Sequence, residues 1–99
     1  MTTPPSQMPD GLELARTTPE FTAESVPPAL LATHTVAAGV WGRIRVRAGT
    51  VRFVFEDADG SGTHTLEAGD HLDIAPERPH HVEPDGEARF VVEFHRPPA

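Results

Sequence analysis

The sequence contains no cysteine, no lysine and no tyrosine. Without cysteine there is no disulfide, no thiolate nucleophile and no sulfur ligand, so a bound metal must be held by His, Asp or Glu. The eight basic residues are all arginine and are outnumbered by 15 Asp and Glu, which gives a formal net charge of −7. An acidic chain lacks the positive surface that binds a phosphate backbone, so nucleic acid and anionic membrane are excluded as partners.

Long apolar runs are also missing. No stretch approaches the roughly 20 apolar residues of a membrane span, and the first residues lack the pattern of a secretory signal, so we expect a cytoplasmic protein. The 99 residues are predicted to form one domain over residues 11–96, after a flexible arm at 1–10 and before a short tail at 97–99. So small a domain buries a modest share of its surface, and a metal or a second subunit, as in a homodimer, is expected to support it.

From residue 29 onward, apolar and polar residues alternate in short runs, and a period of two is typical of β-strands. The runs are residues 40–47, 51–56, 63–68, 71–75, 80–83 and 87–95, separated by turns rich in Gly, Pro and Asp. With no amphipathic helix, this pattern predicts an all-β sandwich or small barrel. The turn at residues 48–50 further predicts a hairpin that places Val46 opposite Phe53.

The segment most informative about chemistry is residues 69–82, GDHLDIAPERPHHV. A glycine turn and an alternating strand lead into Pro-x-x-Pro-His, so His80 follows a rigid corner at the start of the next strand. This pattern resembles the second motif of the cupin superfamily, in which a histidine at this position binds a metal. The first cupin motif supplies two His and a Glu, and here His34 alone stands at a matching place.

A narrower resemblance covers nearly the whole chain after residue 10. It is carried by GLELxxxTPEF at 11–21, His34 ahead of VWGRI at 40–44, PHHVEP at 79–84 and FVVEF at 90–94. In order and spacing these blocks are similar to a small cupin-like family related to the amino-terminal domain of tellurite resistance protein B. The resemblance implies a single cupin-type (jelly-roll) barrel in a bacterial, cytoplasmic protein linked to tellurite or stress resistance, and it brings no established reaction.

Metal ligands must converge on one interior point from different strands. His34 is in phase with Leu30, and His80 with Val82, so both histidines are candidates for the interior. Glu83 and Glu93 are candidates for a carboxylate ligand or for a partner that orients an imidazole. Two His and one carboxylate suit a divalent ion such as iron, zinc, manganese or nickel, and the sequence does not choose among them.

Three further residues are candidates for a ligand pocket. His81 alternates with His80, so it faces the other way unless a bulge intervenes, and its alternative role is to hold neighbours by hydrogen bonds. Trp41 is interpreted as a pocket wall or as a packing or interface aromatic. Arg43 belongs to an arginine stripe that is usually solvated, with anion binding as the alternative.

Two functions of different classes remain open. In the first, the domain binds a divalent metal through His34, His80 and a carboxylate, and senses or transforms a small molecule. In the second, it is a non-catalytic module that binds an organic ligand or dimerises without metal. No Ser/His/Asp triad and no phosphate-binding glycine loop can be read, so no catalytic residue is assigned. Metal content is the observation that separates the two.

Overall fold

The computed structural model describes residues 7–57 and 62–98, which form strands and one short helix. The elements are β1 (Glu13–Thr17), β2 (Phe21–Thr22), α1 (Pro28–Leu31), β3 (Trp41–Ala48), β4 (Thr50–Phe55), β5 (Thr63–Glu67), β6 (His71–Ile74), β7 (His80–Pro84) and β8 (Arg89–Arg96). The six runs predicted after residue 29 are confirmed as β3 to β8, each within two residues of its expected ends. None of the helices described is long and apolar enough to cross a membrane.

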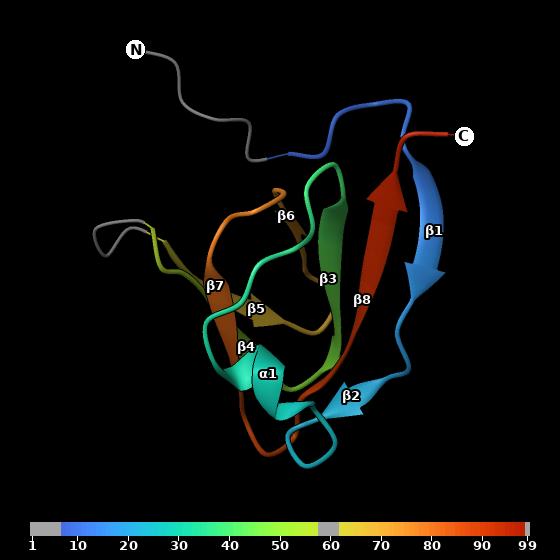
Figure 1. Cartoon of the computed structure of the whole chain (residues 1–99). Coiled ribbons are helices and arrows are strands. Elements are labelled where there is room, and N and C mark those ends of the chain that lie inside the picture. The colour runs from blue at the N-terminus through green and yellow to red at the C-terminus, as the bar shows by residue number, and fades with distance from the viewer. Residues whose placement is uncertain (1–6, 58–61, 99) are drawn as a thin grey trace.

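The strands form two antiparallel sheets. One has the order β1-β8-β3-β6, with β2 added beside β8, and the other has the order β5-β4-β7. The two sheets face each other, and α1 and β2 lie at one end of the space between them (Figure 1). Among the described strands no ladder joins the sheets into a closed barrel. The all-β prediction is therefore confirmed, and the expected barrel takes the form of two open sheets.

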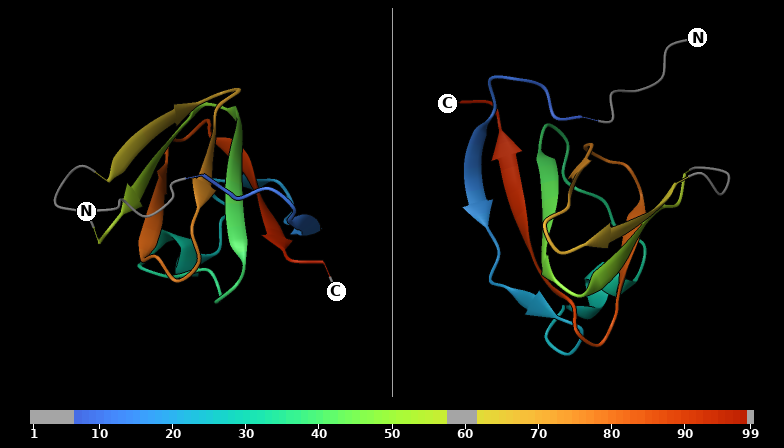
Figure 2. Two further views of the ribbon diagram at one scale, coloured as in Figure 1. Left: turned by 90° about the horizontal axis from the view of Figure 1, so that it is seen from above. Right: turned by 180° about the vertical axis from the view of Figure 1, so that it is seen from behind.

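The predicted hairpin between β3 and β4 is wrong. Val46 lies opposite Phe90 of β8, and Phe53 lies opposite Val82 of β7, so the two consecutive strands belong to different sheets. Seen from above, β3 and β4 diverge from their shared turn (Figure 2). The cause is Gly49, whose φ of 65° bends the chain sharply enough to pass from one sheet to the other. Each strand then buries its apolar face in the same core, from opposite sides.

The core fills the space between the sheets. Its buried side chains include Ile44, Val46, Ile74, Phe90 and Val92 from the first sheet and Val51, Phe53, Phe55, Leu66 and Val82 from the second. Burying each of the large ones contributes roughly 1.5–3 kcal/mol, which is the main stabilisation available to a domain without disulfides.

The ends of the chain are described in part. Residues 1–6 of the expected arm and Ala99 of the expected tail lie outside the described residues. Within the arm, the backbone N–H of Met8 donates to Oδ2 of Asp73 at 2.8 Å, so this part of the arm contacts β6.

Helix α1 was not expected from the sequence, because its four residues are too few to show a helical period. Pro28 occupies its first turn, where a missing N–H costs nothing. The side chain of Leu30 packs against the core, so the helix covers the end of the space between the sheets.

Candidate functional site

The structure brings His34 and His80 side by side. Their backbones form an isolated antiparallel bridge, in which each N–H donates to the other carbonyl at 3.0 Å. Side chains of directly paired residues project from the same face, so the bridge itself makes the two imidazoles meet. The two Nε2 atoms lie 3.2 Å apart.

His80 is a buried neutral imidazole with a defined tautomer. Its side chain stacks on Phe53 at 5.1 Å between ring centroids, and burial lowers its pKa to about 4. Its Nδ1 lies 2.8 Å from the carbonyl oxygen of Arg78, which can only accept, so Nδ1 carries the proton. Nε2 of His80 is therefore left with a lone pair, and it accepts a hydrogen bond from Nε2 of His34.

This chain of hydrogen bonds ends on an unused acceptor. In the neutral form of His34, a proton on Nε2 leaves the lone pair on Nδ1, and this buried atom has no hydrogen-bond partner within the described residues. A buried polar atom without a partner costs about 1–3 kcal/mol. The cost is removed by any molecule that donates a hydrogen bond to this nitrogen.

The corner before His80 is held from both sides. Glu77 adopts a left-handed φ of 60°, and its N–H donates to the carbonyl oxygen of Val36 at 2.8 Å, which ties the corner to the segment that carries His34. The guanidinium of Arg78 stacks 3.7 Å above the ring of Phe55. The Pro-x-x-Pro corner thus positions the imidazole that follows it.

A cavity of about 200 Å³ borders the two histidines between the sheets. Its walls are mostly apolar and come from α1, from β2 and from both sheets; the lining side chains are Phe21, Pro27, Ala29, Leu30, Val36, Ile44, Phe53, Ile74, Val82, Phe90, Val92 and Phe94. The polar lining side chains are His34, His80, Arg16 and Thr18. No carboxylate lines the cavity in the described residues, although the chain contains 15 Asp and Glu.

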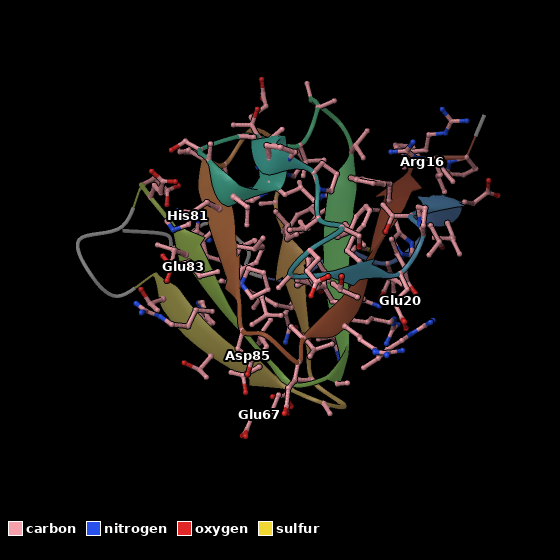
Figure 3. The ribbon with its side chains drawn as sticks, turned by 90° about the horizontal axis from the view of Figure 1, so that it is seen from below. Arg16, Glu20, Glu67, His81, Glu83 and Asp85 are labelled. Atoms are coloured by element: carbon pink, nitrogen blue, oxygen red, sulfur yellow. The ribbon has the colours of Figure 1, made fainter. Side chains whose placement is uncertain are left out.

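On the outer face of β7, His81 holds its neighbours by hydrogen bonds. Its Nδ1 lies 2.7 Å from Glu56 and its Nε2 lies 2.7 Å from Glu83, so both nitrogens donate and the ring is cationic. These two carboxylates raise the pKa of His81, and the contact with Glu83 has the larger effect. Glu56 also accepts from the hydroxyl of Thr33 at 2.7 Å, which braces the segment next to His34. His81 and Glu83 lie on the outside of the sheet (Figure 3).

The carboxylates considered as metal ligands lie away from the histidine pair. Glu83 bonds to His81 as described, and Glu93 accepts from Nε of Arg45 at 2.8 Å on the outer face of the first sheet. Within residues 7–57 and 62–98, no three His, Asp or Glu side chains are grouped so as to hold a metal. Two imidazoles alone supply half of a tetrahedral ligand set, so they fit a metal only when other ligands complete it.

The remaining pocket candidates, Trp41 and Arg43, do not line this cavity. Trp41 is buried in β3 opposite His95 of β8. Arg43 forms a two-bond ion pair with Asp73 and borders a different cavity, of about 410 Å³, near Met8. Sequence reasoning missed Arg16 as a cavity residue. No sequence signal marks it, because the register of β1 shifts between Leu14 and Arg16 and breaks the phase that the two residues share in the sequence.

Two facing antiparallel sheets around a small apolar cavity, with His34 and His80 at its border, define a β-sandwich domain with an internal cavity. Residues 16–92 match the model of the TehB-like domain, and the chain belongs to this family. The tellurite-resistance resemblance is thereby confirmed at the level of the family. No curated protein sequence matches the chain significantly.

Solved structures share the fold. A protein from E. coli (strain K12), solved in a structural-genomics programme, superimposes with a TM-score of 0.82 at 24% identity, covering 94% of this chain and 98% of that one. TehB from Haemophilus influenzae superimposes with a TM-score of 0.80 at 22% identity, covering 91% of this chain. The match spans 33% of the length of that TehB, so this chain is similar to one part of it.

Proposed function

We propose that this TehB-like domain is a non-catalytic module that binds a small molecule in the cavity between its sheets. The observation that carries the proposal is the combination of apolar walls with a histidine pair, His80 buried and His34 half-buried, whose hydrogen bonds end on the buried and unused Nδ1 of His34. Small-molecule sites are typically concave and apolar, with a few polar groups that set the orientation of the ligand. In this proposal the domain acts in the cytoplasm by sensing or holding a molecule that arises under tellurite or related stress.

The cupin-type assignment is part of the same proposal. It is supported by His80, which follows the Pro-x-x-Pro corner, and by its pairing with His34 from an earlier segment. A jelly-roll domain is likewise built from two sheets, and the cavity here lies between two sheets.

Filling the cavity from its helical side is expected to abolish binding. Ala29 lines the cavity from α1 and is exposed, so Ala29→Trp places an indole in the opening without disturbing the core. Leu31→Trp adds a similar bulk to the same helix at an exposed residue that does not line the cavity, and serves as the control. We expect benzamide and benzoate to bind the natural protein in about the millimolar range, as such small ligands do.

The measurement is a two-dimensional amide NMR titration of each protein with each of the two probes. Shifts confined to residues around the cavity, kept in Leu31→Trp and lost in Ala29→Trp, support the proposal. Absence of binding by both probes, or equal binding to Ala29→Trp, contradicts it.

Metal binding is the second candidate, and one observation favours it. The 3.2 Å between the two Nε2 atoms is compatible with two imidazoles sharing one divalent ion, since metal–imidazole bonds are about 2.0–2.1 Å long. The Nδ1–H of His80 is held by a backbone carbonyl, which is the arrangement that orients ligating histidines. A bound zinc, iron, manganese or nickel ion would supply Lewis-acid or redox chemistry, with the remaining positions filled by water or ligand.

If the protein binds a metal, replacing either histidine alone is expected to abolish metal binding. His34→Ala and His80→Ala each remove one of two ligands, so both should lower the metal content to near zero, whereas His64→Ala, at an exposed histidine of β5, should keep it. Elemental analysis of tag-free protein purified without chelator is the measurement. Protein that is metal-free and does not take up any of the four ions excludes this second candidate and leaves the first.

A further inference from the structure

We infer that the cavity selects small organic anions, and that Arg16 at its edge receives the anionic group. This inference names the ligand class for the site and rests on the proposed function of the cavity. Arg16 comes from β1 of the first sheet, whereas the histidine pair borders the cavity from the side of β7, in the second sheet. Figure 3 shows Arg16 on the side of the molecule opposite to His81, which follows His80 in β7.

A β-bulge turns Arg16 toward the cavity. The ladder between β1 and β8 pairs Leu14 with His95 but Arg16 with Phe94, so it shifts by one residue at Ala15. In an unshifted ladder Arg16 would stand opposite Glu93, on the outer face, because each step of one residue reverses the direction of the side chain. The shift places it instead on the face of Phe94, which lines the cavity. Bulges are used in this way to re-aim a side chain beside a functional site.

The bulge also places Arg16 on the face opposite to the ion pairs of its sheet. Arg43 and Arg45 of the same sheet each form an ion pair on the outer face, with Asp73 and Glu93. Arg16 makes no ion pair with any carboxylate in the described part of the chain, and its guanidinium lies 5.0 Å from the ring centroid of Phe94. A guanidinium that is held over an aromatic ring, with its N–H groups unused, is suited to take a carboxylate in two parallel hydrogen bonds.

The cavity edge at Arg16 carries a positive charge on a protein that is negatively charged overall. With a net charge of −7 the protein as a whole repels anions, so an anion that binds must be attracted by a nearby group. The cavity beside Arg16 is lined by Phe21, Phe90 and Phe94 and by no described carboxylate. The ligand that matches both features has a compact apolar body and one negative group, as in a small aromatic or branched carboxylate.

Comparison of benzoate with benzamide tests the inference, because the two probes have the same shape and only benzoate is an anion. Arg16→Gln separates the effect of that charge from the amide N–H, which benzamide alone can donate to His34. We expect the natural protein to bind benzoate about fivefold more tightly than benzamide, the scale of one partly exposed ion pair. In Arg16→Gln the affinity for benzoate should fall to that for benzamide, which should not change. Arg52→Gln removes the same charge from an exposed arginine on β4 and should keep the preference.

A second variant tests the direction of the arginine. Exchanging residues 16 and 17, as Arg16→Thr with Thr17→Arg, keeps the composition and brings the arginine opposite Glu93 on the outer face, so the preference for benzoate should disappear. Arg16→Gln decides the question even when the exchange does not fold. Equal binding of both probes to the natural protein, or a preference that survives Arg16→Gln, overturns the inference and leaves the binding cavity in place. Failure of both probes to bind overturns the cavity proposal as well.

Discussion

Replacing Gly49 by alanine is expected to destabilise the protein more than the same change at any other glycine whose surroundings the structure describes. A Cβ at this position would lie 2.5 Å from the carbonyl carbon of Glu87 and 2.6 Å from the nitrogen of Ala88, which are backbone atoms that cannot move aside. The φ of 65° adds the cost of a left-handed conformation, about 1–3 kcal/mol for a residue with a side chain. We expect a total loss of roughly 3 kcal/mol or more in the free energy of unfolding.

Gly39→Ala is the matched control for this experiment. Gly39 has a similar φ of 77°, but a Cβ there would meet no atom within 4 Å. Its expected cost is about 1 kcal/mol, from the backbone conformation alone. Urea unfolding of both variants measures the difference, and equal losses would show that the close contact at the turn between β3 and β4 is not a constraint.

Acidification from pH 6.5 to pH 4 is expected to weaken the fold through His80. In the unfolded chain a histidine takes up its proton near pH 6.5, whereas in the folded protein burial lowers the pKa of His80 to about 4. Between these values the unfolded state binds more protons, so the free energy of unfolding falls as the pH falls, by up to about 1.4 kcal/mol for each pH unit. The whole effect amounts to roughly 3 kcal/mol.

The contribution of His80 is isolated with His80→Phe, which keeps a buried ring against Phe53 and removes the titrating group. We expect urea unfolding between pH 4 and 7 to show a shallower dependence on pH for this variant than for the natural protein. His81 acts in the opposite sense, because its raised pKa gives stability that is present at low pH and lost as the pH rises. Parallel slopes for the natural protein and His80→Phe would refute this assignment.

The strands were predictable from the sequence, and their pairing was not. Alternation in residues 40–47 and 51–56 shows where each strand runs, since it reflects one buried face. The partner of a strand depends on contacts distant in sequence, and a short turn at Gly49 is equally consistent with a hairpin and with a change of sheet. The alternation shows only which face of each strand is buried in the core. A hairpin and a change of sheet bury the same faces, so the alternation does not distinguish them.

The interior positions of His34 and His80 could be predicted from the sequence, because they depend on residues close to each histidine. Phase placed His34 and His80 in the interior, and the Pro-x-x-Pro corner marked His80 as the start of a strand. The position of Arg16 at the cavity could not be predicted from the sequence. A bulge at Ala15 changes the phase of β1, and no glycine or proline marks the bulge in the sequence. Arg16 therefore read as part of an undefined segment, although it borders the cavity.

The ladder of β7 makes two neighbouring histidines into different chemical groups. His80 is neutral in the interior and His81, one residue on, is a cation between two carboxylates. Successive residues of one strand thus face two different environments, the apolar core on one side of the sheet and the solvent on the other. A reagent that acylates unprotonated imidazoles therefore meets the reactive, neutral form at His80, which is only 2% exposed, and the unreactive, protonated form at the more exposed His81.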